Sequence, residues 1–144
     1  MQDKKIVIIG DSPAAYTCAI YLFTANMSPI IIKKDMNLEY SCTFVPGVDA
    51  EKAEYNQRCL DQAKHMGITI FEAEKISVVE ANNKYTVNYD DKSIESDVLV
   101  LDMPLNLKQK ENLFIVDSLL LEREAIVVAG VGCMIAFEIK EMIH

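Results

Sequence analysis

The chain has 144 residues, of which 51% are hydrophobic and 25% charged, with only five glycines and four prolines. This composition excludes intrinsic disorder, collagen-like repeats and low-complexity sequence, and the length suits one domain. The net charge of −8 argues against nucleic acid or a membrane as the partner, because both are anionic. No apolar run reaches the roughly 20 residues that span a bilayer. The apolar stretch after Lys5 is too short for a signal peptide, so we expect a cytoplasmic protein.

The cysteines and histidines are few and far apart. They are Cys18, Cys42, Cys59, His65, Cys133 and His144. A zinc site needs such ligands in close pairs, and a dithiol redox centre needs two neighbouring sulfurs. The spacing therefore predicts no metal site, and it favours free thiols, buried or half-buried, in a reducing compartment.

The first 35 residues predict a β-α-β unit. Ile6–Ile9 is a continuous β-branched run, typical of a strand buried on both faces of a parallel sheet. Ser12 and Pro13 are typical of a helix start, and a helix is expected over Ala14–Asn26. Ile30–Ile32 then predicts a second buried strand, joined to the first by a right-handed crossover.

The next stretch predicts one irregular segment, one helix and one strand. Residues 36–49 look irregular, and a polar helix is expected from Asp49 or Ala50 to about Met66, ended by Gly67. Ile68–Phe71 predicts a third short strand.

The second half begins with β-rich sequence and ends with a helix. The β-rich segments are Ile76–Glu80, Lys84–Tyr89 and Asp97–Leu101. The last of these is apolar and is predicted to join the main sheet. A polar connector, 104–112, leads to a short strand at Leu113–Val116. The final helix is expected over Cys133–Ile143, and the apolar runs Leu119–Leu121 and Ile126–Val128 are assigned to the core in preference to an interface.

The turn after the first strand carries the first candidate site. Gly10 to Ala15 reads G-D-S-P-A-A, in the position where G-x-G-x-x-G/A indicates dinucleotide binding. In that motif, backbone N–H groups and a helix N-terminus bind a pyrophosphate. Ser12 replaces the middle glycine and places a Cβ where the ligand approaches. On the motif alone, a glycine that serves only the tight turn of a β-α-β unit is the favoured interpretation, and ligand binding is the alternative.

The end of the second strand is the other diagnostic position, where a carboxylate binds ribose hydroxyls. Lys33 stands there instead and can only donate hydrogen bonds, while Asp35 is out of register. A solvated strand end at Lys33 and Lys34 is the favoured interpretation. A different nucleotide, with Lys33 on its phosphate, is the alternative.

Gly10–Leu22 resembles the opening of low-molecular-weight thioredoxin reductases, whose helix reads G-S-G-P-A-A-x-T-A-A-I-Y-x. Four later segments resemble that family in the same order: Phe44–Gly47 (N-F-P-G), His65–Ile70, Arg123–Ile126 (R-Q-A-I) and Ala129–Ala136 (A-G-x-G-C-M-A-A). The resemblance covers nearly the whole chain. It implies an α/β fold, a three-layer Rossmann-like FAD-binding domain with a central parallel sheet, a β-meander layer and a C-terminal helix.

In that family an inserted NADPH domain, which carries a Cys-x-x-Cys pair, interrupts the flavin domain. The resemblance implies that residues 1–144 form one FAD-binding-like domain, in which the connector 104–112 replaces the NADPH domain. Neither NADPH nor the dithiol is then expected, and the chain is not a self-sufficient thioredoxin reductase.

The cofactor-binding positions implied by the resemblance are Gly10, Ser12, Pro13, Ala14, Lys33, Asp117, Arg123, Glu124 and Ala125. Several positions depart from the family pattern. Ser12 and Lys33 replace a glycine and an acid, the family's G-G-Q has no counterpart near Asn37–Thr43, and its A-T-G is here Leu101-Asp102-Met103. Asp102 thus adds a negative charge near the expected phosphates.

Charge also weakens the expected flavin site. A carboxylate at Glu124, near the N1/O2 edge of the flavin, would oppose the anionic reduced form that a helix start at Gly132-Cys133 favours. Such a like-charge contact costs on the order of a few kcal/mol, and each lost glycine or acceptor costs about 1–3 kcal/mol. Together these losses approach the binding free energy of a nanomolar complex, which is about 12 kcal/mol. We therefore expect FAD binding to be weak or lost.

Two functions follow from these observations. The first is a non-catalytic protein-binding or scaffold module, a pseudoenzyme that forms a homodimer by resemblance and joins an unidentified protein partner or larger assembly. The alternative is a small FAD-binding flavoprotein with oxidoreductase activity that depends on an external reductase. Gly10, Asp117 and Arg123, which keep the family pattern, support the alternative.

Overall fold

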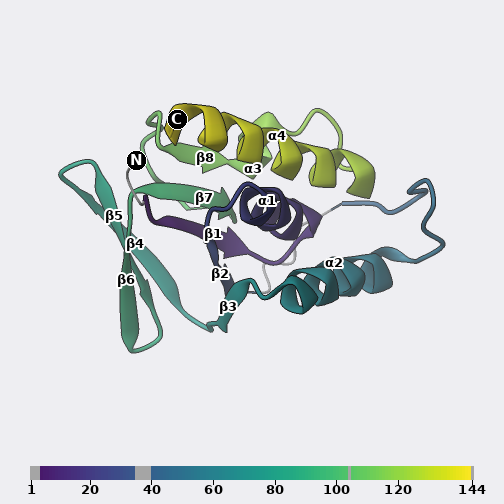
Figure 1. Ribbon diagram of the computed structural model, residues 1–144, viewed down its shortest axis with the longest axis horizontal. Coiled ribbons are helices and arrows are strands. Elements are labelled where there is room, and N and C mark those ends of the chain that lie inside the picture. The colour runs from purple at the N-terminus through teal and green to yellow at the C-terminus, as the bar shows by residue number, and fades with distance from the viewer. Residues whose placement is uncertain (1–3, 35–39, 104, 144) are drawn as a thin grey trace.

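The computed structural model describes residues 4–34, 40–103 and 105–143. A parallel sheet of order β3-β2-β1-β7-β8 lies at the centre, beside an antiparallel sheet of order β4-β5-β6 (Figure 1). In chain order the elements are β1 (Ile6–Gly10), α1 (Pro13–Thr24), β2 (Ile30–Lys33), α2 (Lys52–Met66), β3 (Thr69–Glu72), β4 (Ile76–Ala81), β5 (Lys84–Tyr89), β6 (Lys92–Ser96), β7 (Val98–Asp102), β8 (Leu113–Ile115), α3 (Val116–Leu119) and α4 (Ala125–Ile143).

The molecule has three layers, with the parallel sheet in the middle. On one face, Ile6, Ile8 and Val100 pack with residues of α1, α2 and α4. On the other face, Val7 and Leu99 pack against Tyr85 and Val87 of β5. Both faces of β1 and β7 are therefore buried, which is why their sequences are continuously apolar. The predicted three-layer α/β fold is confirmed.

The β-α-β unit at the start of the chain is also confirmed. Strands β1 and β2 pair in parallel, with Ile8 opposite Ile31. Ser12 is the N-cap of α1, and Pro13 occupies the first turn, as the sequence indicated. Parts of the predicted irregular segment 36–49 and of the connector 104–112, namely 36–39 and 104, lie outside the described residues.

One strand of the β-rich region was missed. The structure has β6 at Lys92–Ser96, and only Asp97 separates it from β7 in the other sheet. No glycine or proline marks this boundary, so the sequence pattern did not reveal it. The Asp97 carboxylate accepts the backbone N–H of Lys5 at 2.9 Å, and this bond ties the change of sheet to the start of β1.

The last helix begins earlier than predicted. α4 starts at Ala125, so Gly130 and Gly132 lie inside the helix and Cys133 is not at its N-terminus. Glycine disfavours a helix interior, which suggested a later start. A tertiary contact explains the glycine at position 132. A Cβ there would lie 2.9 Å from the carbonyl carbon of Ala14 and closer still to the oxygen. α4 packs against α1 (Figure 1), and Gly132 allows the two backbones to come close.

The two apolar runs near the end of the chain are not simply core, contrary to the prediction. Leu119, Leu121 and Ile126 are 43%, 93% and 45% exposed, whereas Val128 is buried. Each run therefore has side chains that face solvent as well as side chains that face the core. None of the helices among the described residues combines the length and apolar character that crossing a bilayer demands.

The two glycines of α4 offer a matched test of this packing. Gly132→Ala should lower the free energy of unfolding by roughly 1–3 kcal/mol, because the added methyl group meets the backbone of α1. Gly130→Ala should raise it by about 0.5–1 kcal/mol, because that position is open and alanine favours a helix. Urea denaturation of both variants checks the pair. Equal effects would contradict the close contact.

Candidate functional site

The carboxyl ends of the parallel strands bring several predicted site residues to one edge of the central sheet. Gly10 ends β1, Lys33 ends β2 and Asp102 ends β7. Asp117 follows β8, at the start of α3. In open parallel sheets this edge is where ligands bind, and the structure brings these residues to it.

Every backbone N–H in the first turn of α1 has a partner within the protein. Pro13 has no N–H, Ala14 donates to the Ser12 hydroxyl oxygen at 3.1 Å, and Ala15 donates to the carboxylate of Asp102. The N–H of Tyr16 reaches the Ser12 carbonyl at 3.3 Å. The Ser12 hydroxyl itself donates to Asp102. These are the donors that a phosphate would use at a helix N-terminus.

Asp102 is buried, with 2% of its surface exposed. Burial raises the pKa of its carboxyl group to about 7, although the hydrogen bonds from Ser12 and Ala15 lower it. The neighbouring carboxylates of Asp11 and Asp117 raise it further. The positive end of the α1 dipole favours the charged form. A buried acid thus occupies the N-terminus of α1.

The position of Asp102 requires a glycine at position 10. Its φ of +150° is one that side chains rarely adopt, and it pairs directly with Asp102 across β1 and β7. A Cβ at this position would lie 2.9 Å from the Asp102 carbonyl oxygen and 3.0 Å from its Cγ. The close approach at this glycine is therefore to Asp102.

Lys33 is not a solvated strand end, contrary to the favoured interpretation. Its side chain is 24% exposed, and its Nζ lies 3.9 Å from Asp11 and 3.7 Å from Glu72. Asp11 also accepts hydrogen bonds from the Tyr16 hydroxyl and, at 3.0 Å, from the Asn56 amide. Burial, followed by the bond to Asp11, raises the pKa of Tyr16 and keeps its phenol neutral. Protein groups thus surround Lys33.

The remaining predicted site residues form a second cluster, beside the start of α4. Arg123 is ion-paired with Asp117. The Glu124 carboxylate accepts the backbone N–H of Thr43 at 3.3 Å and its hydroxyl at 3.1 Å. Ser41 donates its N–H to the Arg123 carbonyl and accepts from Ala125 at 2.7 Å. In this arrangement, Glu124 binds the protein's own 41–43 segment.

Three contributors to these clusters were not singled out by the sequence analysis. Asp11 stands directly after the turn glycine, so its position alone was a usable signal. Asn56 and Thr43 carried no signal, because they reach the clusters from α2 and from the segment that precedes it. Asp35 and part of the predicted Asn37–Thr43 gap lie outside the described residues.

The residues that the resemblance assigns to FAD do not fit a pyrophosphate at the start of α1. The first-turn donors are already engaged, and the carboxylate of Asp102 lies where a phosphate oxygen would accept from Ala15. Asp11 and Asp117 add negative charge nearby, which repels phosphate. Lys33 is shared between two carboxylates.

The cysteines match their prediction as free thiols. Cys18 is buried and the other three are half-buried. Burial raises the pKa of the Cys59 thiol to about 11, and that of Cys18 still higher, so both stay protonated at neutral pH. Among the described residues, no group of three acidic, histidine or cysteine side chains could hold a metal ion.

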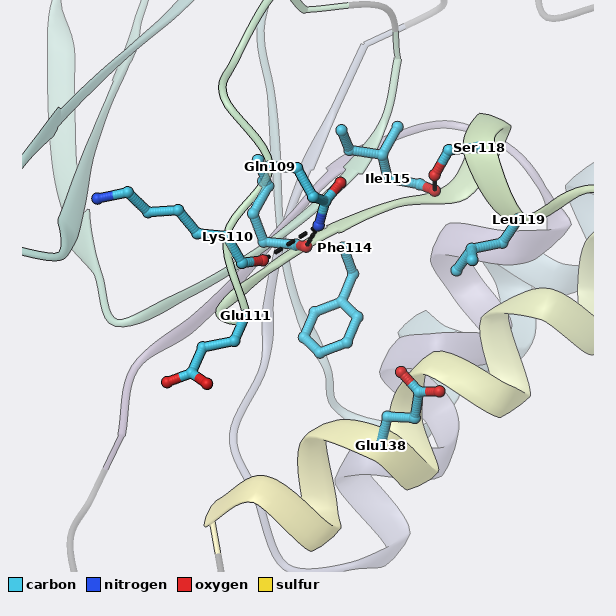
Figure 2. A pocket seen from close by; sticks show the side chains of 9 residues that line it. Gln109, Lys110, Glu111, Phe114, Ile115, Ser118, Leu119 and Glu138 are labelled. Atoms are coloured by element: carbon cyan, nitrogen blue, oxygen red, sulfur yellow. Dashed lines mark hydrogen bonds between the residues drawn. The ribbon is translucent and has the colours of Figure 1, made fainter.

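A hollow of about 280 Å³ lies along β8, between this strand and α4 (Figure 2). Gln109 donates its amide to the carbonyls of Leu113, at 2.7 Å, and Lys110, at 3.1 Å. The Ser118 hydroxyl donates to the Ile115 carbonyl at 2.8 Å. These side chains occupy backbone acceptors of the edge strand, which limits pairing with another strand.

Asp102→Asn tests the buried acid through pH. The folded state holds the proton up to about pH 7, whereas an unfolded aspartate loses it near pH 4. The stabilising contribution is therefore complete below about pH 4 and is lost as the pH rises towards 7. The unfolding free energy of the wild type should fall relative to the variant over this range, by up to roughly 4 kcal/mol. Urea denaturation from pH 4.5 to 8 measures the difference, and a flat difference would contradict the assignment.

By sequence, the chain matches no protein-family model and no curated protein. Solved structures do match. Thioredoxin reductase from Gloeobacter violaceus aligns with a TM-score of 0.60 at 21% identity, over 77% of this chain and 40% of its own. Thioredoxin reductase from Streptococcus pyogenes MGAS5005 aligns with a TM-score of 0.59 at 19% identity, over 74% of this chain and 37% of its own. A ferredoxin-flavin thioredoxin reductase from Clostridium acetobutylicum aligns with a TM-score of 0.58 at 20% identity, over 76% of this chain and 40% of its own.

The chain therefore spans about two-fifths of the length of these structures. At these identities the comparison establishes the architecture. The predicted resemblance is confirmed at that level, and the chain has the fold of a thioredoxin reductase flavin domain.

Proposed function

We propose that this protein is a non-catalytic protein-binding module, built on a thioredoxin reductase flavin domain that no longer holds a dinucleotide. The observation that carries the proposal is the start of α1. Ser12 and Asp102 accept the N–H groups of Ala14 and Ala15 that a pyrophosphate would need. A fold that keeps its core while its ligand donors bind the protein itself serves best as a surface.

The absence of electron-transfer chemistry belongs to the same proposal. Residues 1–144 form a single domain, in which the connector 104–112 stands where relatives of this fold carry a second, NADPH-binding domain. The four cysteines contain no Cys-x-x-Cys pair. The protein would act in the cytosol, without NADPH.

The proposed partner surface is the outer face of α4, and its occupant is a second copy of the chain. Ile126, Met134 and Phe137 are 45%, 59% and 53% exposed along one stripe of the helix. The ring of Tyr21 on α1 extends the stripe, 5.7 Å from that of Phe137. Gly130 lies between the large side chains in open space, so an antiparallel copy could place its Met134 there. This homodimer would then present the module to a larger assembly.

The absence of bound flavin is tested on the wild-type protein. After purification, and again after refolding with excess FAD and desalting, the protein should show no flavin absorption in the visible range. FAD should also leave its melting temperature unchanged. Stoichiometric flavin absorption would overturn the proposal in favour of a small FAD-binding flavoprotein supplied with electrons by an external reductase.

The dimer is tested by placing a charge on the α4 stripe. Met134→Glu should convert the dimer to a monomer in sedimentation velocity, because the carboxylate would be buried against the partner copy. Leu121→Glu is the matched control, since Leu121 is 93% exposed and lies outside α4. A wild-type monomer, or a Met134→Glu dimer, would show that a second copy does not cover this face.

A further inference from the structure

We propose that Asp102 is a built-in replacement for a phosphate anion, and that removing its carboxylate and the Ser12 hydroxyl turns the start of α1 into a phosphate-binding site. The inference rests on the proposed function, because it explains how a chain with this fold dispenses with its dinucleotide. It also names the two side chains responsible.

Strand pairing places this carboxylate where a phosphate would approach. β1 and β7 are neighbours in the parallel sheet, and Gly10 lies directly opposite Asp102. The chain passes from Gly10 into the N-cap of α1 within two residues, so the Asp102 side chain reaches Ser12 and the N–H of Ala15. A carboxylate resembles a phosphate in both respects that matter here, negative charge and oxygen acceptors.

The helix end is the main electrostatic support of this carboxylate. Lys33, at the end of β2, lies beside Asp11 and Glu72, and Arg123 is paired with Asp117. Asp11 and Asp117 oppose the charge on Asp102. What favours an anion at this buried position is thus the set of N–H donors and the dipole of α1, and these remain when the carboxylate is removed.

The two side chains block different donors. Asp102→Gly would free the N–H of Ala15, and Ser12→Gly would free that of Ala14. Together they leave two neighbouring donors without acceptors in a glycine-rich turn, with one negative charge fewer. An unpaired buried donor is costly, so an anion that reaches it gains the full value of the bond.

The experiment compares S12G/D102G with Asp102→Asn, using inorganic pyrophosphate and ADP as probes. Asp102→Asn is the matched control, because the amide removes the charge but fills the same space and keeps an acceptor oxygen. Calorimetric titration measures affinity, and amide NMR shifts at residues 14 and 15 locate the ligand. Circular dichroism checks folding. Asp102→Ala is the second variant if the double glycine variant does not fold, and it should shift mainly residue 15.

The double variant should bind pyrophosphate at least about tenfold more tightly than Asp102→Asn, with shifts at both amides. A folded double variant, or a folded Asp102→Ala, that binds no better than Asp102→Asn would overturn the inference. Binding with shifts only at surface lysines would also overturn it. These outcomes leave the proposed function intact, whereas FAD bound to the wild-type protein would overturn that function by itself.

Discussion

The junction of β1, α1 and β7 depends on one hydrogen-bonded acid. Asp102 ends β7 directly opposite Gly10, and its carboxylate accepts from Ser12 and Ala15 at the start of α1. Taking a carboxylate out of water is costly, and the helix dipole and two donors offset only part of that cost, so the pKa of Asp102 stays raised. The same contact imposes glycine at position 10, because any side chain there would meet Asp102. Strand pairing, the turn and the helix start therefore constrain one another.

A second contact holds the same end of α1 from the other side. Gly132 brings α4 against the backbone of Ala14, so the first helical turn lies between α4 and the end of β7. In a dinucleotide-binding protein, this turn must keep donors free for its ligand. Here the first-turn N–H donors bind acceptors of the same chain. An intramolecular acceptor avoids the translational and rotational entropy that a ligand loses on binding. The chain's own acceptors thus hold this turn in place.

Local patterns predicted the elements well where the physical cause was itself local. Continuous apolar runs identified β1 and β2, and Ser12 with Pro13 marked the start of α1. Prediction was wrong where a distant contact decided the outcome. α4 begins at Ala125 because the contact with α1 makes an internal glycine favourable, and Leu121 is exposed although its neighbours are apolar. Helix propensity and hydrophobicity describe a residue's neighbours along the chain, and these positions depend on neighbours in space.

By itself, the sequence determined the α/β class, the β-α-β unit, the acidic charge, and the replacement of ligand-binding residue types in the Gly10 turn. Only the tertiary structure decided what the replacements do. Ser12 and Asp102 are 90 residues apart, and Thr43 and Glu124 are 81 apart. Strand order and register bring such partners together, and neither can be read from the spacing of residues along the chain. The sequence could therefore show that the Gly10 turn departs from the dinucleotide-binding motif, while the fold showed that a carboxylate of the same chain accepts from the first turn of α1.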